Sequence, residues 1–190
     1  MQYLCIHDKK IVNDLPTTKR IGLDCAVSLS LGDIFQGGIV GYIFNTGDTL
    51  YLSGYIGGII LQQDNPQLFQ WGYTGDTIGS TGLTIGTGQD NTTRILNGTT
   101  LRPIAASYSD TLSLSGFTDW FLPSFYEIKS IKNYLWAPTG FTTWYWTSSE
   151  HGQQTSWIFD ISHTVPTVVS MKTTNLYVKP IRFFYIKICT

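Results

Sequence analysis

The clearest local signal in the sequence is Leu122-Pro123-Ser124-Phe125-Tyr126-Glu127. Within it, Ser124 and Glu127 have the spacing of a capping box, in which each side chain takes up a backbone N–H that the first helical turn leaves unpaired. Apolar residues then continue at helical spacing through Ile128, Ile131 and Leu135. The sequence therefore predicts a helix over 125–135.

Two shorter helices are predicted before this one. Asp90 or Asn91 can cap a helix over 91–97, and Asn97-Gly98 supplies its end. A further helix is predicted over 102–113, where Pro103 is tolerated in the first turn. The chain is thus expected to contain two to three short helices.

Strand patterns flank the helices on both sides. Apolar runs at 39–44 and 57–61, bounded by turn residues, predict two buried strands, and the Gly/Thr-rich stretch 62–88 is expected to be irregular and pinned by Trp71 and Tyr73. Later strands are expected at 143–148, 156–161, 167–172 and 177–188. Their short connections favour an antiparallel β-meander, and the order of strands, helices and strands predicts the α+β class.

The length of the chain, 190 residues, suits one main domain. Four of the 12 Lys and Arg residues, Lys9, Lys10, Lys19 and Arg20, precede residue 31, and little regular alternation accompanies them. We therefore expect an N-terminal arm over 1–30 that anchors the protein, followed by a domain over 31–190.

Composition excludes several partners. With 13% charged residues and a net charge of −1, the chain lacks the basic field that nucleic-acid binding requires, so no nucleic-acid partner is expected. The start lacks the layout of a secretory signal, and no stretch approaches the roughly 20 apolar residues that span a bilayer. The protein is therefore expected either to stay in the cytoplasm or to leave it without the general secretion route, and a virion protein released by lysis fits the second case.

Candidate catalytic and metal-binding groups are few. A hydrolase needs a nucleophile with a base, or two carboxylates across a substrate. Here Glu127 is expected to be a helix cap and Asp119 a buried hydrogen-bond hub, while the Gly-rich run 79–88 lacks the Gly-Lys-Ser/Thr ending of a phosphate loop. His7, His151 and His163 have no metal-like spacing. We therefore expect no enzyme activity, no catalytic residue, no metal and no cofactor.

The three cysteines, Cys5, Cys25 and Cys189, contain no CxxC pair. Their odd number and scatter argue against a disulfide framework and against a zinc site, and a clip between a terminal pair is left open.

An aromatic strand and the turn after it form the candidate binding surface. Alternation places Trp144 and Trp146 on one face and Tyr145 on the other, and we expect Trp146 to be buried, with Tyr145 or Trp144 nearer the surface. Glu150 either binds strand-end backbone amides or faces a ligand. The turn residues either bind sugars or protein loops, or merely solvate a loop. The candidate ligand-binding residues are Trp144, Tyr145, Glu150, His151, Gln153, Gln154, Thr155 and Trp157.

Several motifs occur in the same order as in a known family. They are Gly32-Asp33-Ile34-Phe35-Gln36-Gly37-Gly38-Ile39-Val40, Gln70-Trp71-Gly72, Ile85-Gly86-Thr87-Gly88-Gln89-Asp90-Asn91-Thr92, Gly116-Phe117-Thr118-Asp119-Trp120-Phe121-Leu122-Pro123-Ser124, Tyr145-Trp146-Thr147-Ser148-Ser149-Glu150 and Val178-Lys179-Pro180-Ile181-Arg182-Phe183. Over 31–184 the chain resembles the Lcl C-terminal-like domain of unknown function, common in Bacteroidetes and their phages. The resemblance implies a C-type-lectin-like fold, distantly akin to phage tropism determinants and to the formylglycine-generating enzyme. Many relatives have Pro-His-Gly-Leu-Ile where this chain has Tyr55-Ile56-Gly57-Gly58-Ile59, so no role of that His is carried over.

The resemblance implies display of a binding surface, because a fold alone carries no chemistry. The first hypothesis is a virion-associated bacteriophage protein, such as a tail-fibre, head-fibre or capsid decoration component, that forms a homo-oligomer and displays a surface for a host receptor or glycan. Its arm would dock to other virion proteins, without membrane insertion. The alternative is a bacterial cell-surface or secreted lectin-like module. A third hypothesis, an enzyme of the formylglycine-generating type, is opposed by Cys189 being the single cysteine of the C-terminal half.

Overall fold

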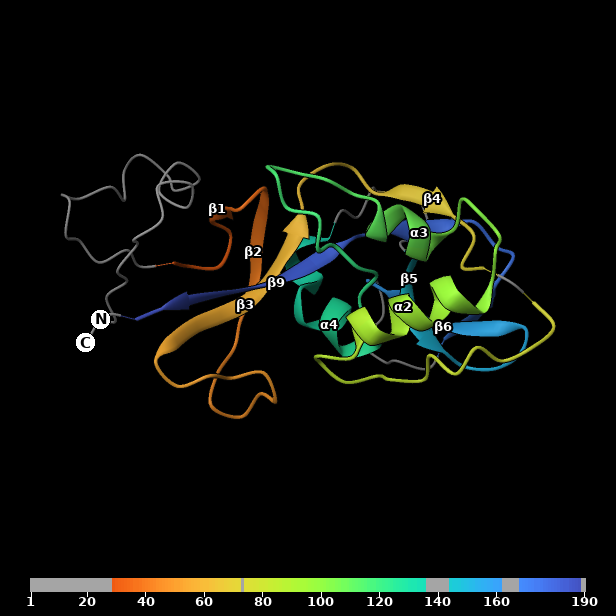
Figure 1. Ribbon diagram of the computed structural model, residues 1–190, viewed down its shortest axis with the longest axis horizontal. Coiled ribbons are helices and arrows are strands. Elements are labelled where there is room, and N and C mark those ends of the chain that lie inside the picture. Colours follow the sequence, from red (N-terminus) through yellow and green to blue (C-terminus); the bar gives the residue numbers. More distant parts are fainter. Residues whose placement is uncertain (1–28, 73, 136–143, 162–167, 189–190) are drawn as a thin grey trace.

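The computed structural model of the chain describes residues 29–72, 74–135, 144–161 and 168–188. These residues form a mixed α+β structure made mostly of two sheets, with a few short helices packed between and beside them (Figure 1). The α+β prediction is therefore confirmed.

The two sheets lie toward opposite ends of the molecule (Figure 1). One sheet has four strands in the order β1-β2-β3-β9, and the other has five in the order β4-β8-β5-β6-β7. The strands of the first are β1 (Ile34–Phe35), β2 (Gly38–Ile43), β3 (Tyr55–Gln62) and β9 (Ile181–Lys187). Those of the second are β4 (Gln67–Phe69), β8 (Leu176–Val178), β5 (Trp144–Glu150), β6 (Thr155–Asp160) and β7 (Val169–Met171).

Strand β3 is buried on both of its faces. Leu61 belongs to the core between the sheets, whereas Ile60 packs with Phe35 and Trp120 on the other side. A strand covered on both faces needs a continuous apolar run rather than alternation, which is what 57–61 provides. Gly58 permits the close packing, because a Cβ there would contact Tyr42 O and lie 2.8 Å from the Phe184 ring.

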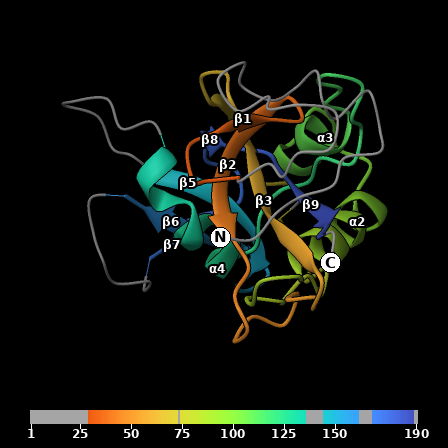
Figure 2. The ribbon, with the colours of Figure 1, turned by 90° about the vertical axis from the view of Figure 1, so that its left-hand side faces the viewer.

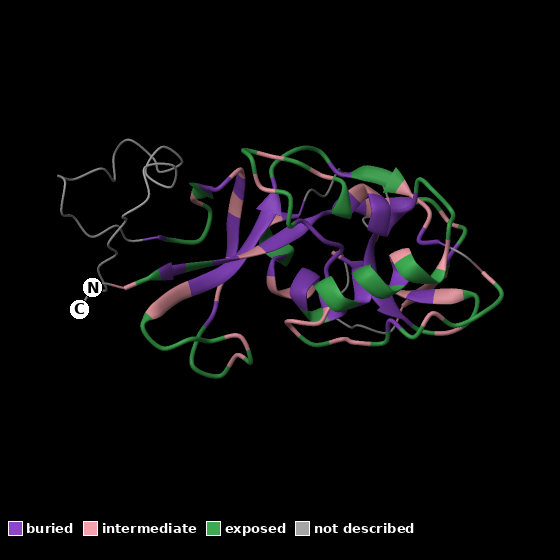
Figure 3. Ribbon diagram, viewed as in Figure 1, coloured by how far each residue is buried: buried purple, intermediate pink, exposed green. Residues whose placement is uncertain are grey.

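Within the described residues, four short helical segments accompany the sheets. Helix α4 (Phe125–Ser130) fills the space between the sheets, where Phe125 and Ile128 share one core with Ile59 of β3 and Phe159 of β6. Helix α2 (Gly88–Gly98) packs on β5 and on α3 (Ala105–Asp110), and its outer face is exposed (Figure 3). A 3-10 turn, η2 (Lys132–Tyr134), follows α4.

The predicted helices are confirmed with changes at their ends. The helix predicted over 125–135 is divided into α4 and η2, and α3 is shorter than the predicted 102–113. Helix α2 ends at Gly98 as expected, but the predicted cap is wrong, because the N-cap residue is Thr87. Asn91 lies inside the helix instead, where its side chain accepts from Gly82 N at 3.2 Å and donates to Gly82 O at 2.7 Å.

The predicted meander is correct for three strands and wrong for the last two. Strands β5, β6 and β7 pair antiparallel in sequence order, but β8 pairs parallel with β5, at Tyr145 and Tyr177, and β9 lies beside β3 in the other sheet. The strand predicted over 177–188 is interrupted because Pro180 has no N–H for a ladder. Its carbonyl oxygen accepts from Gln62 N at 3.1 Å, and the chain crosses to the first sheet at this point.

Lys179 is buried at this crossing. Its Nζ donates to Asp64 O at 2.7 Å. Burial lowers the pKa of Lys179 to about 8, and the negative charge of Asp64 only partly opposes this effect. The folded protein therefore holds this proton more weakly than the unfolded chain does.

Glu127 confirms the capping box and also binds a second segment. Its carboxyl group is buried and accepts from Ser124 N at 2.7 Å, Gly86 N at 2.7 Å and Gly88 N at 3.3 Å. Burial raises the pKa of Glu127, and these backbone hydrogen bonds oppose the shift. One side chain thus connects the start of α4 to the start of α2 and to the Gly-rich loop before it.

Substitution of Gly88 by Ala should lower the free energy of unfolding by about 1–3 kcal/mol. A Cβ at Gly88 would contact Glu127 Oε2 and lie 2.9 Å from the Phe121 ring, and both are held by the core. Urea unfolding monitored by tryptophan fluorescence measures the change. Gly152→Ala is the control, because its Cβ would meet only Thr155 Oγ1 at 3.7 Å. Equal stability of the two variants would contradict the account of Glu127.

A pH dependence follows from Lys179. Because its folded pKa lies below the unfolded value of 10.5, the unfolded state binds more protons between pH 8 and 10.5, and stability from this group rises with pH across that window. This rise in the free energy of unfolding should reach up to about 3 kcal/mol in the parent protein, and the Lys179→Met variant should not show it. Urea unfolding at pH 7.5 and pH 10 tests this, with exposed Lys187→Met as the control. Parallel pH profiles for the parent and Lys179→Met would contradict it.

Candidate functional site

Three segments meet at the end of the molecule away from β1 and β2, and we call them the tip (Figure 1). The tip comprises residues 74–80, 150–157 and 170–175. Backbone hydrogen bonds connect the segments: Gly75 N donates to Gln153 O at 3.4 Å, and Lys172 N donates to Gln154 O at 2.9 Å. The β5–β6 hairpin therefore lies between the other two segments.

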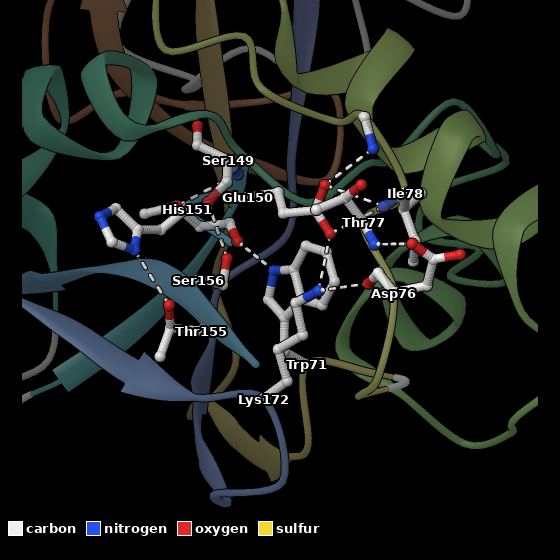
Figure 4. Close-up of polar contacts among 12 residues, drawn as sticks. Trp71, Asp76, Thr77, Ile78, Ser149, Glu150, His151, Thr155, Ser156 and Lys172 are labelled. Carbon is white, nitrogen blue, oxygen red and sulfur yellow. Dashed lines mark hydrogen bonds and ion pairs between the residues drawn. The ribbon is translucent and has the colours of Figure 1, made fainter. Parts of the chain in front are cut away.

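A buried ion pair lies inside the tip (Figure 4). Lys172 Nζ is 2.6 Å from Glu150 Oε1, and the two side chains are 0% and 1% exposed. The Glu150 carboxylate also accepts from Ile78 N at 2.9 Å and from Gly79 N at 2.7 Å. All three segments of the tip thus contribute to one hydrogen-bonded centre.

Trp71 completes the surroundings of the lysine. The Lys172 ammonium lies 4.7 Å from the centroid of the Trp71 ring, an attraction worth about 2 kcal/mol when desolvated. The indole itself is fixed because Nε1 donates to Thr147 O at 2.8 Å. A backbone hydrogen bond joins the same two residues, because Trp71 N donates to Lys172 O at 2.9 Å.

The predicted aromatic strand lies mostly inside the protein. Trp146 is buried as predicted, and its Nε1 donates to Phe69 O at 2.9 Å. Trp144 is nearer the surface and donates to Asp160 Oδ2 at 2.8 Å. Tyr145 is 0% exposed and packs beside Tyr177, so its placement in a surface patch is wrong. Both faces of β5 are covered, and simple alternation does not reveal that.

Glu150 adopts the first of its two expected roles. Its carboxylate binds the backbone amides of Ile78 and Gly79, and it is closed to solvent by Lys172. The structure does not bring it onto the same surface as the turn residues.

The other predicted residues stay together at the tip. His151, Gln153 and Gln154 are exposed, and Thr155 and Trp157 are partly exposed. His151 Nδ1 lies 3.0 Å from Thr155 Oγ1, and its ring meets Trp157 edge to face at 4.9 Å between centroids. Together they form a surface of amides, a hydroxyl and two rings.

The sequence predicts that Trp71 fixes the irregular stretch 62–88, but no pattern in it predicts the burial of Lys172. The lysine is 22 residues from Glu150 along the chain, and no local motif connects the two. A lysine in a predicted strand is ordinarily a solvent-facing residue. Tyr73, the other predicted pin, lies outside the described residues.

Asp119 differs from its expected role. Its side chain is 49% exposed rather than buried, and it forms two hydrogen bonds with Arg182, at 2.6 Å and 2.9 Å. Arg182 is the buried member and also donates to Gln36 Oε1 and lies over the Phe117 ring. The hub at this position is therefore the arginine.

In the described part of the chain, no group of three or more His, Cys, Asp and Glu side chains is placed to hold a metal ion. Within the same residues no helix has the length and apolar character needed to cross a membrane. The three cysteines, His7, His163 and nearly all of the predicted arm lie outside the described residues.

Comparison with known proteins places the chain in no family. No family model matches the sequence, and no curated protein matches it. The crystal structure of a fimbrial protein from Bacteroides ovatus is similar over 84% of this chain, with 14% identity and a TM-score of 0.47. The match covers 46% of that protein, so this chain spans about half of its length.

Removal of either member of the ion pair should destabilise the protein strongly. Lys172→Met leaves a buried carboxylate and Glu150→Gln leaves a buried ammonium, so each should lower the free energy of unfolding by about 3–5 kcal/mol. The double variant should lose less free energy of unfolding than the sum of the losses of the two single variants, because it buries neither charge without its partner. Exposed Lys132→Met is the control and should have little effect. Additive losses in a double-mutant cycle measured by urea unfolding would show that the pair is not coupled.

Proposed function

We propose that this chain is a non-enzymatic binding domain that presents its tip to a receptor or glycan on a bacterial host. The observation that carries the proposal is the buried Glu150–Lys172 pair, which joins the three tip segments while the side chains of Gln153 and Gln154 remain exposed. Such rigid support lowers the conformational entropy lost when a partner binds.

A binding role fits the tip better than catalysis does. Glu127 and Glu150 are buried and bound to backbone amides, and Asp119 is paired with Arg182, so these acids serve structural contacts. The tip exposes amides, a hydroxyl and aromatic rings, with Asp76 as its exposed acid. Recognition surfaces use this combination because rings supply area and amides supply direction.

The setting that we propose is the exterior of a bacteriophage particle, in a tail-fibre, head-fibre or capsid decoration component with a C-type-lectin-like fold. The ordered motifs over 31–184 support it through their resemblance to the Lcl C-terminal-like domain. The layout suits it as well: β1 and β2, which follow the arm in sequence, lie at the end away from the tip (Figures 1 and 2). In this arrangement the arm over 1–30 docks to other virion proteins while the tip faces outward.

A homo-oligomer completes the proposal. Weak contacts between a tip and a cell surface multiply through effective concentration when several copies share one particle. The bacterial cell-surface module is the alternative to the virion setting.

Fractionation of a culture that expresses the gene tests the setting. The protein should appear by mass spectrometry in density-purified particles, in a fixed ratio to the major capsid protein. Its presence only in the bacterial envelope fraction would overturn the virion setting in favour of the alternative.

Competition tests the role of the tip. Purified protein, added first, should reduce adsorption of those particles to host cells, and a Gln153→Ala, Gln154→Ala, Trp157→Ala variant should not. Lys129→Gln, on α4 outside the tip, serves as the matched control. Equal competition by parent and tip variant would overturn the assignment of the binding surface.

A further inference from the structure

The tip carries little free charge. Its ionisable residues, all within the described ranges, are Asp76, Glu150, His151 and Lys172. Glu150 and Lys172 are buried and neutralise each other. The tip therefore exposes no lysine or arginine, and its exposed acid is Asp76.

An anionic partner would be disfavoured by this arrangement. The Asp76 side chain is held in place, because its Oδ1 accepts from Thr77 N at 2.7 Å. A second negative charge about 4 Å away costs about 1 kcal/mol in water, which is about a fivefold loss of affinity. The nearest cation in the network, Lys172, cannot compensate, since its ammonium is buried against Glu150 and Trp71.

The exposed polar groups of the tip match hydroxyl groups. Gln153, Gln154 and Asn175 are exposed amides, and each amide both donates and accepts hydrogen bonds, as a sugar hydroxyl does. Thr174 adds a hydroxyl, which accepts from Ser170 Oγ at 3.3 Å. A partner with many neutral hydroxyls satisfies these groups without bringing charge.

Trp157 supplies an apolar surface in the same β5–β6 hairpin as Gln153 and Gln154. Its ring makes edge-to-face contacts with His151 and Phe125, at 4.9 Å and 6.3 Å between centroids, and it stays partly exposed. A fixed amphipathic ring loses little entropy on binding and packs against the C–H face of a pyranose.

We infer that the tip binds an uncharged glycan directly, with no bridging metal ion. The inference draws on the low exposed charge of the tip, on its exposed amides and hydroxyl, and on the Trp157 ring. The inference rests on the proposed binding function and specifies its ligand. We infer direct contact because calcium bridging requires six or more oxygens, mostly from acids. In the described part of the tip the single exposed acid is Asp76.

Immobilised polysaccharides test the ligand class. Dextran, mannan and galactan are offered to the full chain in 5 mM EDTA and, separately, in 5 mM calcium chloride, and at least one should bind equally in both. Carboxymethylation of the polymer that binds should weaken binding by about fivefold at low salt. Asp76→Asn should reduce that loss, Trp157→Ala should abolish binding, and Lys129→Gln should match the parent.

Three results would overturn the inference: no binding to any neutral polymer, tighter binding to the carboxymethylated form, or binding that EDTA removes. None of them decides the proposed function, which depends on competition for adsorption to cells. If the tip variant still fails to compete, the tip remains the binding surface and its partner is a charged glycan or a protein. If both assays fail, the binding function itself is rejected.

Discussion

A buried charge needs a partner and a full set of hydrogen bonds, and this requirement shapes the end of the molecule that we propose to be functional. Glu150 ends a core strand, and its carboxylate can be buried only because Lys172, Ile78 and Gly79 all reach it. Ile78 and Gly79 belong to one segment of the tip, Lys172 belongs to a second, and Glu150 itself belongs to the third. The buried charge of one side chain therefore helps to fix the relative positions of three segments that are far apart in the sequence.

Glu127 has a similar role at the start of α4. Irregular backbone inside a protein exposes N–H groups that must find acceptors. Glu127 accepts from Ser124, Gly86 and Gly88, so the Gly-rich loop is fixed without being part of a sheet. The carboxyl groups of Glu127 and Glu150 thus accept the backbone N–H groups of loops, as carbonyl groups do between paired strands. Two acids that are candidates for catalysis by residue type therefore have structural roles.

Local chemistry made much of the fold predictable. The capping box at Ser124 and Glu127 identified α4, and apolar runs identified β2, β3, β5 and β6, because these signals depend on neighbouring residues. The errors concern contacts between distant residues. Parallel pairing of β8 with β5, burial of Tyr145 on the second face of its strand, and the partnership of Lys172 with Glu150 depend on the assembled fold. The exposure of the turn residues at the candidate site is predictable from their polar composition, whereas the burial of Lys172 beneath them is not.

Strand β9 has a consequence for mechanical load. It runs from the crossing at Pro180 toward the end of the molecule away from the tip, and it pairs with β3 from Leu61↔Ile181 to Tyr55↔Lys187 (Figure 1). The hydrogen bonds of an antiparallel ladder lie perpendicular to the strands. A force along β9 therefore loads all the hydrogen bonds between β9 and β3 at the same time rather than one after another. A domain held at one end and tugged at the other would resist by shear, and its lifetime under tension would be set by the simultaneous rupture of that ladder.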